Sequence, residues 1–141
     1  MPQYFWPLSL VVFSNAAYHV ASKSTPQNAN PFISLIVTYL IAASACLALF
    51  FMSPHQKGFI ESFSGLSWVS VALGVTIVGL EYGYLMAYRL GADVSTGPLM
   101  SYIALSVLLI PIGILFYREN VSLTQVAGVG LCFAGLLLIN K

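Results

Sequence analysis

The sequence predicts an all-α membrane protein with five transmembrane helices. Hydrophobic residues make up 59% of the 141 residues and charged residues only 6%, whereas charged residues are roughly a quarter of a typical soluble domain. The charged residues leave five long charge-free runs, which are 1–22, 24–56, 62–80, 94–117 and 120–140. Each run can supply the roughly 20 helical residues that cross a bilayer, and none has the short alternating pattern of a membrane strand. This composition excludes a soluble globular domain, a disordered chain and a nucleic-acid binder.

The first two expected spans are separated by a polar loop. The first covers residues 5–22, with Pro7 in its first turn, where a missing N–H group is harmless. The loop at 24–31 is rich in Ser, Asn and Pro, and the second span covers 32–52. The following stretch, 59–67, is short and mixed in polarity, which predicts an interfacial segment.

The third and fourth expected spans cover residues 68–88 and 97–117. The fourth is expected to begin in the stretch Ser95-Thr96-Gly97-Pro98, with a hydroxyl cap and with Pro98 at the first helical position. Pro111 lies inside this span and is expected to kink it, because a proline removes one helical hydrogen bond.

The fifth expected span covers residues 122–140. Ser122 and Gln125 stand three residues apart in the capping-box pattern, which predicts that Ser122 opens the helix. Together the five spans predict one membrane domain over residues 1–141.

The cationic residues at the span ends give almost no preference for either orientation of the chain in the membrane. With five spans, Lys57 and Arg118 fall on the N-terminal face, and Lys23, Arg89 and Lys141 fall on the other. The positive-inside rule therefore gives almost no bias. Two interpretations remain open. In the first, all copies take a single, weakly determined orientation. In the second, the topology is dual: copies insert both ways and pair antiparallel as two inverted halves.

Glu81 is the charged residue that lies in the middle of a span. A carboxylate there is expected to face a cavity or a partner rather than lipid. Such a group can hold either a proton or a cationic substrate. Tyr84 and Tyr88 follow at i+3 and i+7, on the same helix face, and their rings are candidates to contact a cation. The structural alternatives are an ion pair of Glu81 with Lys23 and a place for Tyr88 in the interfacial aromatic belt.

The first span carries a polar stripe. Asn15, His19 and Lys23 repeat every four residues, and Tyr18 stands beside them. A water-filled path explains this stripe better than lipid does, and an imidazole can relay protons near physiological pH. Tyr102 in the fourth span is a further candidate for the same cavity. The alternatives are that Asn15 only bonds a neighbouring helix and that Lys23 reaches the interface.

Small residues mark a candidate contact face in the fifth span. Gly128, Gly130, Ala134 and Gly135 permit close helix packing, and we assign them to a dimer contact, with packing inside the chain as the alternative. The sequence holds no nucleotide-binding loop, metal-ligand cluster or nucleophile–base pattern. We therefore expect no cofactor, no metal, no catalytic residue and no enzymatic activity.

Three segments carry a family resemblance. Residues 117–125, with glutamate, then glutamine six residues on, and the later Gly128 and Gly135, resemble the end of an EamA domain of the drug/metabolite transporter superfamily. Residues 87–95 resemble the link between the third and fourth spans of that family, and Ser14-Asn15 its small-residue–Asn element. A single five-span unit also looks similar to the small multidrug resistance proteins, which have four spans, dimerise and keep an acid in their first span, where residues 5–22 have none.

The resemblance implies secondary transport of a small solute by alternating access. We therefore expect a multi-pass protein of the cell (inner) membrane that forms a homodimer, parallel or antiparallel. It would transport an amine, a quaternary cation or a metabolite, with proton coupling through Glu81. The alternative is a non-transporting membrane subunit, or a component of a lipid-linked sugar flippase, that pairs with another protein.

Overall fold

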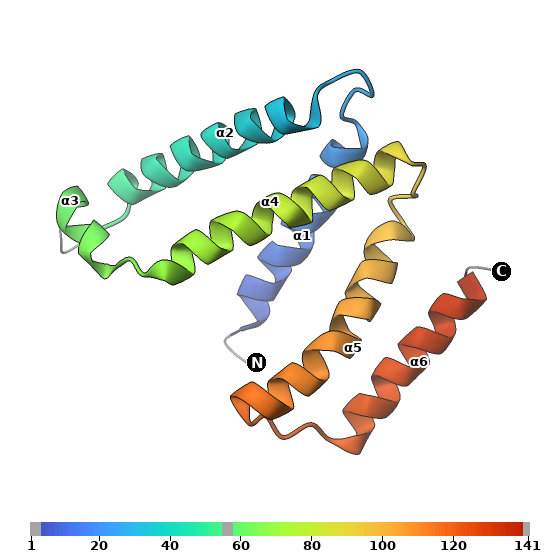
Figure 1. Cartoon of the computed structure of the whole chain (residues 1–141). Helices are drawn as coiled ribbons and strands as arrows, with labels where there is room; N and C mark the ends of the chain where they lie inside the picture. The colour runs from blue at the N-terminus through green and yellow to red at the C-terminus, as the bar shows by residue number, and fades with distance from the viewer. Residues whose placement is uncertain (1–3, 55–57, 140–141) are drawn as a thin grey trace. The chain divides into compact units, whose positions relative to one another are not determined.

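The protein is described by a computed structural model that covers residues 4–54 and 58–139. Over these residues the chain is helical and contains no strand (Figure 1). The helices are α1 (Phe5–Lys23), α2 (Pro31–Met52), α3 (Phe59–Ser62), the 3-10 helix η1 (Phe63–Gly65), α4 (Trp68–Arg89), α5 (Gly97–Tyr117) and α6 (Leu123–Ile139). The all-α prediction is confirmed, and α1, α2, α4 and α5 begin and end within one residue of the expected helical ranges. Helix α6 begins one residue after its expected start, and its expected end at residue 140 lies outside the described residues.

Three of these helices are long and apolar enough to cross a membrane. They are α2, α4 and α5, and α6 contributes a shorter apolar stretch, Leu123–Gly135. Helix α1 has 19 residues, but its polar stripe lowers its hydropathy. Most large apolar side chains of the described helices are exposed, which is the arrangement expected where lipid surrounds a helix.

The helix starts follow from local side chains. Asn30 caps α2, because its Oδ1 accepts hydrogen bonds from the N–H groups of Phe32 (2.9 Å) and Ile33 (3.3 Å). At α6 the capping box is confirmed. The Ser122 N–H donates to Gln125 Oε1 (2.8 Å), and the Gln125 N–H donates to Ser122 Oγ (3.3 Å).

The expected hydroxyl cap of α5 is wrong. Thr96 precedes the helix, but its backbone is already helical (φ −99°, ψ −36°) and its side chain makes no capping hydrogen bond. A capping hydroxyl normally reaches the first-turn N–H groups from extended backbone, which Thr96 does not adopt. Pro98 does lie in the first turn, and α5 continues through Pro111 to Tyr117. A kink at Pro111 stays a prediction.

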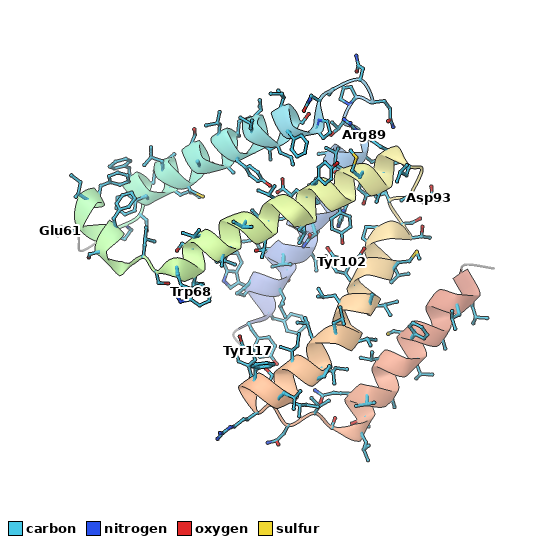
Figure 2. The ribbon with its side chains drawn as sticks, in the orientation of Figure 1. Glu61, Trp68, Arg89, Asp93, Tyr102 and Tyr117 are labelled. Atoms are coloured by element: carbon cyan, nitrogen blue, oxygen red, sulfur yellow. The ribbon has the colours of Figure 1, made fainter. Side chains whose placement is uncertain are left out.

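The chain forms two compact units. In the first, which contains α1 to Ala21 and the residues from Leu90 on, α5 packs against α6 (Figure 1). In the second, Ser22–Arg89, α2 packs against α4. Arg89 fastens the end of α4 to the loop before α2, because its guanidinium donates to the carbonyl oxygens of Pro26 (3.3 Å) and Ala29 (2.6 Å) (Figure 2).

Candidate functional site

The second unit holds an acid beside a phenol. Glu81 lies near the middle of α4 and is half-buried. The carboxylate of Glu81 interacts with the hydroxyl of Tyr39, which comes from α2. This hydroxyl is buried, and in this conformation no acceptor meets full hydrogen-bond geometry with it. Glu81 and Tyr39 thus place an acid and a phenol from two neighbouring helices next to each other.

Sequence reasoning did not find Tyr39. It is the only tyrosine in residues 31–52, and this single hydroxyl-bearing ring in a strongly apolar helix was the signal available. A ring stack also joins α2 to α4. The rings of Phe32 and Tyr82 lie parallel, with centroids 5.2 Å apart. The stack joins the same two helices that carry Tyr39 and Glu81.

The two tyrosines expected on the same helix face as Glu81 form a stacked pair. The rings of Tyr84 and Tyr88 lie 6.2 Å apart, 23° from parallel. Tyr88 is only 4% exposed, so it does not occupy the exposed surface of an aromatic belt. The Nζ atom of Lys23 lies 5.8 Å from the centre of the Tyr88 ring. The face of Tyr88 therefore already attracts a cation of the chain itself.

The first unit holds a hydrogen-bond network between α1 and α5. The Tyr102 hydroxyl of α5 donates to Asn15 Oδ1 of α1 (3.0 Å) and lies 3.2 Å from His19 Nε2, also of α1. Figure 2 labels Tyr102 on α5. The ring of Tyr18 stands edge-on to His19, with centroids 5.1 Å apart. Asn15 and His19, which the sequence placed on one polar stripe, thus meet Tyr102, and Tyr18 flanks them.

An open groove lies beside this network. It has a volume of about 370 Å³ and is lined by residues of one face of α1, namely Leu10, Val11, Ser14, Asn15 and Tyr18. The groove is shallow and open, because all of its lining residues come from one face of a single helix, and it does not enclose a solute. Asn15 and Tyr18 belong both to this groove and to the group of side chains around His19. Among the described residues, no group of three or more His, Cys, Asp or Glu side chains is placed to hold a metal ion.

Comparison with protein-family models matches residues 5–141 to the EamA-like transporter family. The chain belongs to the EamA-like transporter family. Membership makes it a membrane transporter-like protein of the drug/metabolite transporter superfamily, a group that is generally non-enzymatic. Comparisons with curated proteins and with solved structures each found no match.

The motif at 117–125 of this EamA-family chain forms a tight corner. Arg118 adopts the left-handed conformation (φ 53°, ψ 35°), and its N–H and that of Glu119 both donate to the Gly113 carbonyl. The turn folds the Glu119 side chain back against α5, where a Cβ atom at Gly113 would lie 2.5 Å from Glu119 Oε2. The structure thus places the Glu119 side chain against α5, the helix before the corner.

The four small residues of α6 lie on two faces of this EamA-family chain. Gly128 and Gly135 are seven residues apart, share one face and are half-buried, whereas Gly130 and Ala134 lie on the opposite face and are exposed. No other part of the described chain lies within 4 Å of a Cβ atom built at any of the three glycines. One contact surface cannot use all four residues.

Proposed function

We propose that this EamA-like chain is a secondary active transporter of a small solute, and that Glu81 exchanges a proton for a cationic substrate. The observation that carries the proposal is the half-buried Glu81 carboxyl of α4, a helix apolar enough to cross a membrane, beside the buried hydroxyl of Tyr39. An ionisable group at such a depth is costly, and it is typical of ion and substrate pathways.

The Tyr39 hydroxyl gives Glu81 a polar neighbour from a second helix. A phenol can donate a hydrogen bond to the carboxylate and so stabilise its charged form after a proton leaves. An amine, a quaternary cation or another cationic metabolite fits this chemistry.

We propose that α1 and α6 also cross the membrane, which gives the five spans of one EamA unit. Helix α1 has 19 residues, about 28 Å at 1.5 Å per residue, close to the hydrocarbon thickness of a bilayer. Its polar residues Asn15 and His19 bond to Tyr102 of α5, so lipid does not have to accommodate them. The remaining apolar surface of α1 is suited to lipid.

We propose that two copies form the transporter, each supplying one half around the site. The exposed face of α6 with Gly130 and Ala134 is the contact surface that this arrangement uses, because small residues let helices approach closely. Labelling the two termini from each side of the membrane distinguishes an antiparallel dimer from a parallel one. Signal from both sides for each terminus indicates antiparallel pairing, and signal from one side indicates parallel pairing.

The test is proton-driven uptake into proteoliposomes. Agmatine and tetraethylammonium serve as amine and quaternary probes, and an imposed pH gradient drives uptake. We expect Glu81→Gln to reduce gradient-driven uptake to the level of protein-free vesicles. Glu61→Gln is the matched control, since Glu61 is exposed in the short helix α3, and it should transport like the unsubstituted protein. Full proton-coupled uptake by Glu81→Gln would refute the role of Glu81.

The exposed face of α6 also favours a second candidate, a non-transporting membrane subunit that binds a different protein. A component of a lipid-linked sugar flippase is one form of this candidate. The two candidates predict different behaviour on purification. A stable homodimer that binds a small solute supports the transporter, whereas a monomer that becomes stable only with a partner protein supports the subunit.

A further inference from the structure

The hydrogen bonds between α1 and α5 have a definite direction. Asn15 Nδ2 lies 3.0 Å from the Val11 carbonyl oxygen, one turn earlier in α1. A carbonyl oxygen can only accept a hydrogen bond. The amide nitrogen of Asn15 must therefore face Val11, and a flipped amide would set two acceptor oxygens against each other. This contact fixes Oδ1 as the atom that faces Tyr102.

The orientation of the Asn15 amide decides which atom donates in its hydrogen bond with Tyr102. Asn15 Oδ1 is an acceptor, and it lies 3.0 Å from the Tyr102 hydroxyl. The hydroxyl has a single proton, and this proton must be donated to Oδ1. The Tyr102 oxygen is then left with lone pairs on the side of its other neighbour.

That neighbour is His19 Nε2, at 3.2 Å. Because the Tyr102 proton is committed to Asn15, the hydrogen bond forms only if Nε2 carries a hydrogen and donates it. His19 is 4% exposed, so bulk water does not readily replace Tyr102 as the acceptor. The geometry therefore selects one tautomer of the neutral imidazole.

We propose that Asn15 and Tyr102 are positioning residues that hold His19 in its Nε2–H form, so that His19 gains or loses a proton only at Nδ1. The hydrogen-bond chain runs from His19 through Tyr102 and Asn15 to the Val11 carbonyl. Protons do not continue along it, since an amide is a poor proton carrier. The chain orients the imidazole, and its use in transport rests on the proposed function.

The test is nitrogen NMR of the full-length protein in detergent micelles with ¹⁵N-labelled histidine. The chain has two histidines, so His55→Gln assigns the His19 signals. In the neutral imidazole we expect Nε2 to give the signal of a protonated nitrogen and Nδ1 that of an unprotonated one. On acidification the Nδ1 signal should make the large change. A wild-type signal from the Nδ1–H form, or from a mixture of both forms, would overturn the proposal.

Two variants test the positioning residues themselves. Asn15→Leu leaves the Tyr102 proton without its acceptor and lets Tyr102 donate to Nε2, so the Nδ1–H form should appear. Tyr102→Phe removes the hydroxyl that accepts from Nε2, so a mixture of the Nε2–H and Nδ1–H forms should appear. This variant keeps the test usable if Asn15→Leu does not fold. Ser106→Ala is the control, because Ser106 Oγ bonds only the Tyr102 backbone carbonyl (2.8 Å), and it should keep the wild-type signals. A pure Nε2–H signal in both folded variants would refute the positioning role.

This measurement is independent of transport. Transport that fails while the His19 signals respond as expected would refute the proposed function and leave the positioning role intact. Signals that do not respond, in a protein that transports through Glu81, would refute the positioning role alone.

Discussion

At the scale of single residues, the proposed transport depends on a carboxyl group and a phenol from neighbouring helices. The sequence identified Glu81 because a charge in the middle of an apolar span is rare. It did not identify Tyr39, because which tyrosine meets an acid depends on how α2 packs against α4. Tyr102 was expected to line the same cavity as His19, but their direct contact depends on how α1 packs against α5 and was not predicted.

Removing the Tyr39 hydroxyl should slow transport without abolishing it. Tyr39→Phe keeps the ring and loses the group that stabilises the Glu81 carboxylate, a contribution of about 1 kcal/mol. We expect initial rates of pH-driven agmatine uptake to fall about fivefold. Tyr117→Phe is the matched control, since Tyr117 is 75% exposed at the end of α5 (Figure 2). Equal rates for the two variants would show that the Tyr39 hydroxyl takes no part.

At the scale of elements, sequence rules worked where local chemistry decides. The capping box predicted the start of α6, because its bonds join residues three apart. The predicted hydroxyl cap of α5 was wrong, because a hydroxyl residue before a helix does not cap it when the backbone of that residue is already helical. The corner between α5 and α6 was also missed, because the left-handed Arg118 decides where Glu119 points.

The corner can be tested with a double-mutant cycle. A methyl group at Gly113 would meet the Glu119 carboxylate, so Gly113→Ala should destabilise the protein by displacing that side chain. In a Glu119→Ala background the space is open, and the same substitution should cost about 1 kcal/mol less. Denaturation in detergent micelles measures both free energies. An identical cost in the two backgrounds would show that Glu119 does not lie against Gly113.

At the scale of the whole molecule, composition and charge spacing predicted a helical membrane protein, and the segments at 14–15, 87–95 and 117–125 resembled the EamA family. The family match and the apolar helices agree with this prediction. Neither the substrate nor the assembly could be predicted in the same way. The small residues of α6 show why, since spacing alone grouped four residues that helix geometry divides between two opposite faces.

The proposed dimer contact predicts unequal effects of two glycine substitutions. Gly130→Leu places a bulky side chain on the exposed face of α6 and should reduce the dimer fraction seen by cross-linking in membranes. Gly74→Leu is the control, since Gly74 lies on α4 and a Cβ atom there meets no neighbour in the described chain. A dimer fraction that is unchanged by Gly130→Leu, or that falls only with Gly74→Leu, would show that the dimer contact does not use this face of α6.

The central claim is that one carboxyl group holds either a proton or the substrate. Infrared difference spectroscopy of the reconstituted protein tests this most directly, because a protonated carboxyl has a carbonyl band that its ionised form lacks. Adding a transported cation should remove such a band in the unsubstituted protein and in Glu61→Gln, and should remove none in Glu81→Gln. A band that is unaffected by the cation, or that is lost equally in Glu81→Gln, would contradict the claim.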